Sequence, residues 1–526
     1  MIMEILILLN LRINYENARR KNKGSYKRSG YVLCRALEAC STKSKKVMKR
    51  FLIGISLFLL IVLSVLLLRT LTYSSRQIKA EFAPAPAADS GTIAHLAAAI
   101  RFRTISYSDP RLFDSTQFIG FRNFLAQTFP LVHRHLKTEI VAGYSLLYEW
   151  EGSNSSLEPY ILMAHQDVVP VEEGTEAIWT VDPFAGILRN DFIWGRGTAD
   201  DKINLIAIME AVEKLLKENF RPSRTIYLAF GHDEELDGRG AMAIAKLLRD
   251  RNVRAGLVLD EGGFITRDKV PGLARPVALL GTSEKGALSL EMRVEKTGGH
   301  SSMPEQETAI DILARGVTKL REHPFAPRFS ASTEGFLDHI GPEMPFTQRI
   351  AFANRWLFTP VIYSIYQKSG PGNALIRTTM APTIFRAGVK ENVIPTVASA
   401  TFNFRLLPGD SAGMVIGKVS DIIDDERIRI TPLLPYREAS AVTSSESFAF
   451  RKVREIIQSV SDSLITAPFL MIAATDSRHF EIVSDGIIKF SPIYDPIGFH
   501  GIDERVSVES YRTALWFYEQ LIRDTK

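Results

Sequence analysis

From residue 92 onward, short apolar runs alternate with amphipathic stretches along the chain. Three runs are brief and strongly apolar with turn residues behind them, and they predict buried strands at Tyr160–Ala164, Thr225–Phe230 and Gly256–Leu259. Between these runs, apolar residues recur at helical spacing and predict helices over Asp201–Glu218 and Ala241–Arg251. This alternation favours an α/β fold with a doubly wound, mostly parallel sheet and helices on both faces.

The pattern changes near Glu284, where alternation of apolar and polar residues replaces the continuous apolar runs. It predicts half-exposed strands at Ala287–Val294 and Val397–Leu406, with a helix over Ala309–Leu320 between them. We therefore expect an inserted α+β domain over residues 284–435, which divides the main domain into residues 92–283 and 436–526. Helices predicted over Ser447–Ser459 and Ser507–Arg523 complete the main domain. The segment Phe325–Leu375 is rich in proline and aromatic residues and gives no clear pattern; shaping an apolar pocket is one hypothesis for it.

An uncharged run of eighteen residues, Phe51–Leu68, lies between a group of lysine and arginine residues and Arg69. Since about 20 apolar residues span a bilayer, the run predicts one transmembrane helix over residues 51–69. A Pro/Ala-rich linker follows over residues 70–91. A cleaved signal peptide is the alternative, although its apolar region is usually about 7–15 residues long. A buried core helix is disfavoured by the adjacent cations.

The basic residues of the first 50 positions indicate how the chain is oriented in the membrane. Residues 1–50 carry a net charge of +10 while the whole chain carries +5, so the remainder is mildly acidic at −5. This excess predicts a cytoplasmic tail over residues 1–50 and a body on the extracytoplasmic side, whether periplasmic, extracellular or lumenal. Met48 is an alternative start that would leave 47 residues upstream. An acidic body disfavours nucleic acid as a partner. Both cysteines, Cys34 and Cys40, precede the predicted span, so a metal site in the body would have no cysteine ligand.

Side chains of the types that bind metals lie close to the ends of the predicted strands. They are His165 and Asp167 after the first strand, Asp200 before the first helix, Glu234 and Glu235 after the second strand, and Asp260 and Glu261 after the third. Because the carboxyl ends of parallel strands meet at one edge of a sheet, these side chains are expected to lie close together. Crowded negative charge is unfavourable unless cations are bound, so the pattern predicts a metal site. Each residue taken alone is more often an ordinary loop or helix-capping residue.

Six short motifs, in order and spacing, resemble those of the zinc exopeptidase family that includes carboxypeptidase S, aminoacylase and the N-fatty-acyl-amino-acid hydrolases. They are Met163–Pro170 (MAHQDVVP), Trp194–Lys202 (WGRGTADDK), Gly231–Glu235 (GHDEE), Leu259–Gly263 (LDEGG), Gly299–Ser302 (GHSS) and Asn392–Pro395 (NVIP). The resemblance is greatest to carboxypeptidase S and the fatty-acyl hydrolases, and it extends from about Thr92 to the C-terminus. It implies that the main domain is catalytic. The implied reaction is cleavage of the amide bond next to a free carboxylate in small peptides or N-acyl amino acids.

The resemblance also implies that the main domain binds two zinc ions. The implied ligands are His165, Asp200, Glu235, Asp260 and His500. Asp200 would bridge both ions, since a carboxylate has two oxygens to offer. Asp260 is the ligand chosen here, although the neighbouring Glu261 is chemically able to replace it. His500 lies in a late glycine-flanked loop, where a histidine is usually just exposed, so only the resemblance assigns it.

Two further residues of the main domain receive catalytic roles from the resemblance. Asp167 would orient or polarise His165 from behind. Glu234 would be the general base, which takes a proton from the attacking water and returns it to the leaving amine.

The inserted domain supplies the remaining site residues by resemblance. His300 would reach the active site of a neighbouring copy and stabilise the developing oxyanion, which implies a homodimer and a lid-like role for this domain. Arg405, with Asn392, would hold the substrate carboxylate, because a planar guanidinium binds a carboxylate through two hydrogen bonds. Taken without the resemblance, His300 is a surface histidine and Arg405 is an arginine on a strand face.

Two other functions fit part of this pattern. A co-catalytic zinc aminopeptidase uses a similar metal core but binds a free amine, and a carboxylate would then be expected where Arg405 stands. A membrane-tethered binding protein that has lost catalysis would not need the general base Glu234. A serine hydrolase and a His-Glu-x-x-His protease find no support, because neither of their motifs is present.

Overall fold

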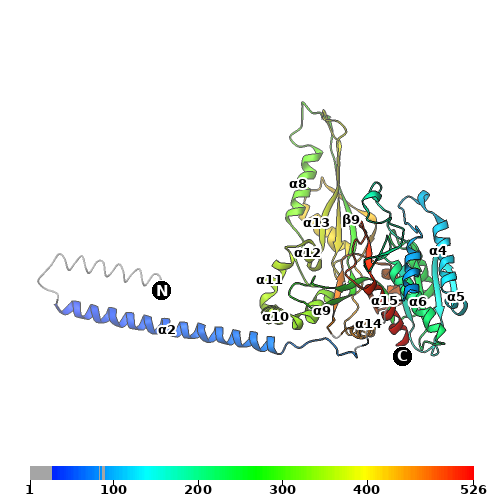
Figure 1. Ribbon diagram of the computed structural model, residues 1–526. Coiled ribbons are helices and arrows are strands. Elements are labelled where there is room, and N and C mark those ends of the chain that lie inside the picture. Colours follow the sequence, from blue (N-terminus) through cyan, green and yellow to red (C-terminus); the bar gives the residue numbers. More distant parts are fainter. Residues whose placement is uncertain (1–26, 82, 84, 86–88, 462, 526) are drawn as a thin grey trace. The chain divides into compact units, whose positions relative to one another are not determined.

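The computed structural model describes residues 27–81, 83, 85, 89–461 and 463–525, with side chains from residue 46 onward. The chain divides into two compact units, Met1–Thr72 and Tyr73–Lys526. In the first unit, α2 (Lys27–Leu71) is one continuous helix, and its part Lys46–Leu71 is long and apolar enough to cross a membrane (Figure 1). The helix therefore includes the run predicted as a span, whereas the start of the predicted tail, residues 1–26, lies outside the described residues.

The second unit is built on an eight-stranded sheet with the order β1-β2-β6-β3-β7-β16-β8-β15. The strands are β1 (Lys137–Val141), β2 (Ser145–Trp150), β3 (Tyr160–His165), β6 (Ile226–Gly231), β7 (Leu257–Thr266), β8 (Val277–Glu284), β15 (Ile465–Met471) and β16 (Ile487–Tyr494). The pairs β6–β3, β3–β7, β7–β16 and β8–β15 are parallel. The three predicted strands are confirmed as neighbours in the parallel centre.

The expectation of a mostly parallel sheet needs correction, because the pairs β1–β2, β2–β6 and β16–β8 are antiparallel. At the β1 edge the cause is local. Only three residues connect β1 to β2, and Ala142 and Gly143 among them have positive φ. Such a short turn can only return the chain alongside itself, in the opposite direction. The sheet is therefore mixed.

Helices cover both faces of this sheet. On one face, α3 (Ser90–Ile100), α6 (Lys202–Lys217) and α15 (Val508–Arg523) pack together, and α7 (Arg239–Asp250) and η4 (Asp476–Ile482) lie on the other (Figure 1). Leu205, Ile208 and Val212 of α6 are fully buried, as their helical spacing predicted. The apolar pattern along the chain thus identified α6, α7 and α15 to within about two residues, whereas α3 and η4 were not predicted.

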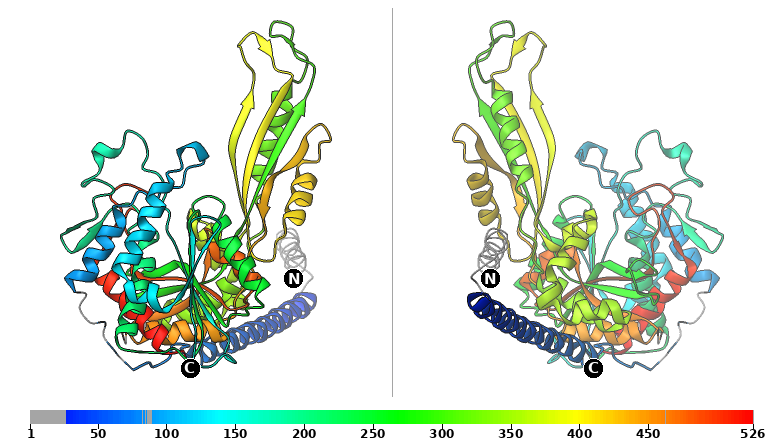
Figure 2. Two further views of the ribbon diagram at one scale, coloured as in Figure 1. Left: turned by 90° about the vertical axis from the view of Figure 1, so that its right-hand side faces the viewer. Right: turned by 90° about the vertical axis from the view of Figure 1, so that its left-hand side faces the viewer.

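A second, antiparallel sheet has the order β11-β13-β9-β14 and lies between β8 and β15 in the sequence. Its strands are β9 (Gly286–Glu295), β11 (Thr379–Ala387), β13 (Val397–Leu406) and β14 (Arg429–Arg437). The helices α8 (Ala309–Glu322) and α13 (Ala412–Ile423) cover one face of it, with α8 running along the strands in Figure 2. Alternate residues of β9 and β13 are buried under these helices, so their other face stays open.

The segment Phe325–Leu375, which had no clear pattern in the sequence, folds into four helices. They are α9 (Ala331–Ile340), α10 (Phe346–Ala353), α11 (Arg355–Tyr366) and α12 (Gly370–Ile376). Leu337 and Ile340 of α9 pack against β15, so these helices cover the edge of the large sheet.

The remaining elements are shorter or peripheral. They are η1 (Pro110–Leu112), α4 (Ser115–Thr128), α5 (Pro130–His135), η2 (Glu176–Ile178), β4 (Ile187–Arg189), β5 (Phe192–Trp194), β10 (Gly299–His300), η3 (Gly341–Glu343), β12 (Val393–Ile394), α14 (Phe448–Gln458) and β17 (Arg505–Ser507).

Candidate metal centre

The parallel centre of the large sheet brings side chains from distant parts of the sequence to one edge. His165 is the last residue of β3, Glu235 follows β6, and Glu261 lies in β7. Asp200 lies just before α6, and His500 lies in the loop between β16 and β17. These five side chains form two groups of three that could each hold a metal ion, with Asp200 in both.

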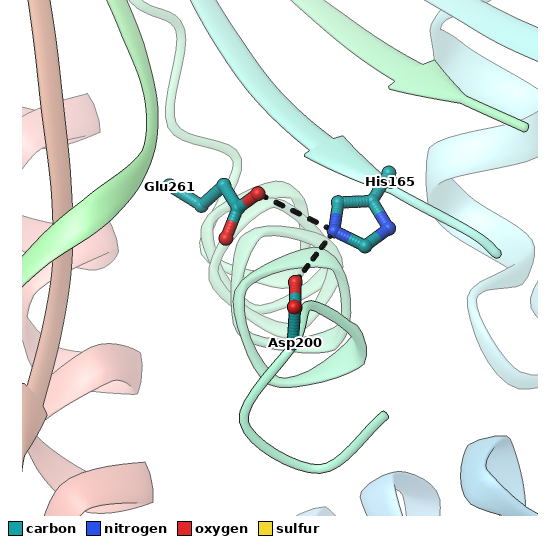
Figure 3. A group of neighbouring side chains, drawn as sticks. All are labelled: His165, Asp200 and Glu261. Atoms are coloured by element: carbon teal, nitrogen blue, oxygen red, sulfur yellow. Dashed lines mark hydrogen bonds and ion pairs between the residues drawn. The ribbon is translucent and has the colours of Figure 1, made fainter. Parts of the chain in front are cut away.

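The first group consists of His165, Asp200 and Glu261, all of them buried (Figure 3). His165 Nε2 lies 2.8 Å from Asp200 Oδ1 and 3.4 Å from Glu261 Oε1. Figure 3 shows both carboxylates pointing at this one imidazole nitrogen. One cation placed among these three side chains would replace repulsion between the carboxylates by attraction to each.

The second group consists of Asp200, Glu235 and His500. The other oxygen of Asp200, Oδ2, lies 2.6 Å from His500 Nε2, and Glu235 Oε1 lies 3.3 Å from the same nitrogen. The imidazole of His500 is about half exposed, whereas the carboxylates of Asp200 and Glu235 are buried. The two oxygens of Asp200 thus face different groups, and this carboxylate belongs to both.

Asp167 is fully buried behind His165 and holds several parts of the site at once. His165 Nδ1 donates a hydrogen bond to the backbone oxygen of Asp167 at 3.0 Å, which leaves Nε2 free to face the first group. The Asp167 carboxylate accepts hydrogen bonds from Ser106 Oγ at 2.6 Å, Glu235 N at 3.1 Å and Glu234 N at 3.2 Å. Asp167 therefore fixes the ring orientation of His165 and the backbone of both glutamates.

The geometry favours Glu261 over Asp260 as the candidate ligand of the first group. Asp260 Oδ1 accepts a hydrogen bond from Glu261 N at 3.0 Å, and Oδ2 accepts one from Ser477 N at 2.7 Å. Successive residues of a strand point to opposite faces, so when Asp260 points toward η4, Glu261 points toward His165. Glu261 takes the place that the sequence analysis gave to Asp260.

Glu234 lies beside the two groups and belongs to neither. Burial raises the pKa of the Glu234 carboxyl well above its usual range, and the neighbouring carboxyl group of Asp476 raises it further. Asp476 is itself buried, with no hydrogen-bond partner for either side-chain oxygen within the described part of the chain. It lies against Gly231, where a Cβ atom would come within 2.6 Å of its Oδ2. A buried carboxyl group beside candidate metal ligands is a suitable proton acceptor and donor.

The electrostatics of the site favour the binding of divalent cations. Burial and the nearby Asp200 carboxylate raise the pKa of Glu261 from 4.5 to about 8. Hydrogen bonds to Asp200 and Glu235 raise the pKa of His500 to about 10. The shift in the pKa of Glu261 reflects repulsion by Asp200 in addition to burial, and the shift in the pKa of His500 reflects attraction to two carboxylates. Each group offers one imidazole and two carboxylates, and three protein ligands of these types are typical of catalytic zinc sites, so the residues present fit two zinc ions.

Arg196 and Glu504 were not identified from the sequence, yet they connect the loops that carry Asp200 and His500. Their side chains form a fully buried ion pair across 308 residues of sequence. Glu504 Oε1 also accepts a hydrogen bond from Ala199 N at 2.8 Å, and Arg196 Nη2 donates one to Gly501 O at 3.0 Å. Arg196 lies inside a recognised motif, but nothing in the sequence indicated its distant partner.

The three site residues predicted in the inserted domain do not belong to either group. His300 in β10 pairs with Val393 in β12, next to Asn392, and both predicted side chains on this ribbon are exposed. His300 Nδ1 accepts a hydrogen bond from Ser302 Oγ at 2.8 Å. An exposed His300 remains available to a second copy of the chain.

Arg405 lies on the open face of the second sheet, together with a second arginine. Arg405 in β13 and Arg437 in β14 both pair with Ala287 in β9, so the three side chains share one face and a small residue separates the two cations. The positive charges of Arg478 and Arg405 add to burial in lowering the pKa of Arg437, while Glu234 acts in the opposite direction. Arg437 therefore lies within electrostatic reach of both Arg405 and Glu234.

A cavity of about 290 Å³ lies at the junction of the two sheets, where β8 leads into β9 and β14 leads back. Its lining includes Glu284, Lys285, Arg437, Arg478 and His479. Glu438 and Glu481 also line it, so three lysine or arginine side chains and three glutamates surround the cavity.

Comparisons with known proteins agree with this geometry. The family model described as "Peptidase family M20/M25/M40" matches residues 161–524. "Probable carboxypeptidase S-like 2" of Dictyostelium discoideum is 40% identical over 498 residues, which cover 92% of this chain and 94% of that protein. The human "N-fatty-acyl-amino acid synthase/hydrolase PM20D1" is 40% identical over 439 residues, which cover 82% of this chain and 86% of that protein.

Solved structures show the same fold at much lower sequence identity. An M20 family metallo-carboxypeptidase from Sulfolobus solfataricus is 19% identical with a TM-score of 0.59, and the match covers 83% of this chain and 99% of that one. Human carnosine dipeptidase 1 is 15% identical with a TM-score of 0.52, and the match covers 82% of this chain and 96% of that one. By its sequence, and in agreement with its fold, the chain belongs to peptidase family M20/M25/M40, a family of metal-dependent hydrolases that typically use zinc.

Proposed function

We propose that the chain is a two-zinc hydrolase that cleaves the amide bond next to a free carboxylate in small peptides or N-acyl amino acids. The observation that carries this proposal is the position of Asp200, whose two oxygens face His165 in one group and His500 in the other. Relatives named as carboxypeptidases and as N-fatty-acyl-amino acid synthase/hydrolases support this class of substrate.

Zinc bound by the two groups would supply Lewis acidity, which polarises the amide carbonyl and makes the attacking water easier to deprotonate. The chain itself supplies the proton transfer. Glu234 takes the proton of the attacking water and passes it to the leaving amine. Because Asp167 binds the backbone N–H groups of both Glu234 and Glu235, the base keeps a fixed position relative to His165.

The open face of the second sheet supplies recognition of the substrate carboxylate. Arg405 binds the carboxylate through its planar guanidinium, and Asn392 adds a hydrogen-bond donor from the β10–β12 ribbon. Arg437, on the same sheet face as Arg405, adds positive charge toward the catalytic groups. A cation pair next to the general base favours substrates that carry a free carboxylate over substrates that carry a free amine.

His300 contributes from a second copy of the chain and stabilises the developing oxyanion there, so the working enzyme is a homodimer. Its exposure on the β10–β12 ribbon supports this assignment, since the side chain is not taken up by its own chain's metal centre.

The part of α2 from Lys46 to Leu71 anchors the enzyme in a membrane as a single span. The lysine and arginine residues before this span place the N-terminal tail on the cytoplasmic side and the catalytic body on the extracytoplasmic side. A signal sequence can have the same length and apolar composition as this span. Retention of the chain in the membrane is therefore measured directly, by extraction at alkaline pH.

The decisive variant is Glu234→Gln, which removes the proton-accepting group and keeps the shape of the side chain. We expect kcat to fall by roughly 10²- to 10⁴-fold, the usual contribution of general acid–base catalysis, while bound zinc is retained. Glu173→Gln, a matched change at an exposed glutamate, should leave turnover unchanged. Unchanged turnover in Glu234→Gln would contradict the mechanism.

The substrate class is tested with N-acyl amino acids, N-acetylated dipeptides and dipeptide amides that have a free amine but no carboxylate. We expect hydrolysis of the first two kinds and little of the third. Preference for the third kind would indicate an aminopeptidase, and zinc binding without hydrolysis of any substrate would indicate a binding protein.

A further inference from the structure

The helix α11 presents one half of its surface to solvent, and that half is apolar. The exposed side chains fall within about 180° of each other at 100° per residue, and they are Trp356, Leu357, Pro360, Val361, Ser364 and Ile365. We call these six residues the α11 face. Trp356 is 57% exposed and Ile365 is 60% exposed, and the face contains no charged residue. An apolar surface of this kind on a folded protein usually marks a binding site for protein or membrane.

The opposite half of α11 is held by the body of the protein. Ile362 is buried, and the ring of Tyr363 lies 4.7 Å from that of Phe329, centroid to centroid. The α11 face is therefore the outer side of a helix that is fixed in place, and not a frayed segment.

The beginning of the second unit is bound next to the same helix. Tyr73 Oη donates a hydrogen bond to Leu337 O in α9 at 3.0 Å. Asp338 forms two ion pairs, one with Arg76 at 3.3 Å and one with Arg355, the first residue of α11, at 2.5 Å. Residues 73–76 are thus fastened to α9 and to the start of α11.

The covalent chain limits how far this region can lie from the membrane. The apolar helix ends at Leu71, and only Thr72 separates it from Tyr73. Two residues span at most roughly 7 Å even when fully extended, and the headgroup region on each side of a bilayer is about 5–7 Å thick. Whatever the angle between the two units, Tyr73 and its contacts on α9 and α11 lie close to the bilayer surface.

We infer that the α11 face lies at the boundary between the lipid headgroups and the acyl chains of the membrane that holds α2. The inference rests on the anchor in the proposed function, and it adds a second, independent membrane contact made by the catalytic body. Tryptophan and long apolar side chains are typical of helices that lie in this interface. Lys368, exposed just after α11, supplies a cation for lipid phosphates at the end of the face.

The tryptophans of the chain allow a direct test. Of the five, Trp356 is exposed, whereas Trp150, Trp179, Trp194 and Trp516 are each less than 10% exposed. The full chain is reconstituted in phosphatidylcholine nanodiscs with or without acyl chains that carry bromine near the headgroup. Bromine in contact with Trp356 should remove part of the emission, and Trp356→Phe should lose that quenching.

Two further variants distinguish a membrane contact from a general change of structure. The double variant V361D/I365D puts two carboxylates on the α11 face and keeps Trp356. It should lose bromine quenching, become open to quenching by iodide in water, and keep its turnover of a soluble substrate. Val389→Asp, at a loop residue that is 94% exposed, is the control and should leave bromine quenching unchanged.

Several results would overturn the inference. Quenching of Trp356 by iodide and not by bromolipid would place the α11 face in water. Protection from both quenchers would mean that protein covers it, for instance a second copy of the chain. Release of the full chain from membranes at alkaline pH would show that α2 does not anchor it, and the inference depends on that anchor. Turnover is measured in the same samples, so a failure of the proposed reaction is recorded separately.

Discussion

Replacement of Asp167 by asparagine tests whether the site depends on this carboxylate for its geometry. The change keeps the size of the side chain but leaves one acceptor oxygen where there were two. In the wild type, Oδ1 accepts from Glu234 N, and Oδ2 accepts from Glu235 N and Ser106 Oγ. Whichever way the amide is turned, its NH₂ group faces a backbone N–H, so one buried donor loses its acceptor.

The expected loss of zinc affinity and of activity follows from this one unsatisfied donor. One unsatisfied buried donor costs about 1–3 kcal/mol, which corresponds to a roughly 5- to 150-fold change in an equilibrium constant. Residues that support metal ligands from behind typically change metal affinity or activity by about 10- to 100-fold when mutated. Two independent arguments therefore give the same range for D167N.

The assay is zinc affinity by competition with a chelator, together with kcat/KM. Ser106→Ala is the graded control, because it removes one hydroxyl donor and leaves every backbone N–H with its acceptor, so its effect should be smaller. If D167N bound zinc and turned over within about twofold of the wild type, Asp167 would not hold the site as described.

Three further predictions concern other parts of the site. Glu261→Gln should lower zinc content on the folded protein while Asp260→Asn retains most of it, measured by elemental analysis; the reverse order would restore Asp260 as the ligand. Arg405→Lys should raise KM for an N-acyl amino acid by roughly 10- to 150-fold, since a hydrogen bond to a charged group is worth about 1.5–3 kcal/mol, with a smaller rise in R437Q; unchanged KM values would exclude carboxylate binding here. Burial lowers the pKa of Lys285 from 10.5 to about 7. The unfolded chain then binds more protons than the folded chain between about pH 7 and 10.5, so Lys285 makes stability rise with pH through that window. The free energy of unfolding, measured with denaturant at several pH values, should rise less steeply with pH in K285M than in the wild type. An equal rise in both proteins would contradict the lowered pKa of Lys285.

The sequence predicted the parallel centre and the edge that carries the candidate metal ligands because both depend on local patterns. His165, Glu235 and the pair Asp260–Glu261 lie within a few residues of the ends of the predicted apolar strands, so local patterns locate them without knowledge of the whole fold. The same holds for Asp200, which lies two residues before the start of α6. Helical and strand periodicities are properties of ten to twenty residues, and these are readable from one sequence.

The choice between Asp260 and Glu261 could not be made in this way. Both residues lie in β7, and adjacent side chains in a strand point to opposite faces. Which face of β7 points toward His165 depends on how β7 is aligned with β3 and on where η4 lies. Ser477 N in η4 donates a hydrogen bond to the Asp260 carboxylate. The contact of Asp260 with Ser477 spans 217 positions, and the pairing of β7 with β3 joins Leu257 to the distant Tyr160, so no local pattern contains either.

The helices α9–α12 were missed for a different physical reason. In α11 the apolar residues are not confined to one buried stripe, because the exposed half is apolar as well, and Pro360 lies within the helix. A helix with this composition has no clear polar face, so periodicity gives no signal. If the α11 face contacts the membrane, its apolar side chains explain both that contact and the absence of a polar face in the sequence pattern.

Zinc stoichiometry in Asp200→Asn is the most direct test of the shared carboxylate. Elemental analysis of the purified full chain should find two zinc ions per wild-type chain, one for each group of candidate ligands. Asp200→Asn should weaken both sites and leave less than one ion per chain, whereas Glu235→Gln, which touches only the second group, should leave about one. Two ions retained in Asp200→Asn would contradict the account, because the two groups would then not depend on a common carboxylate.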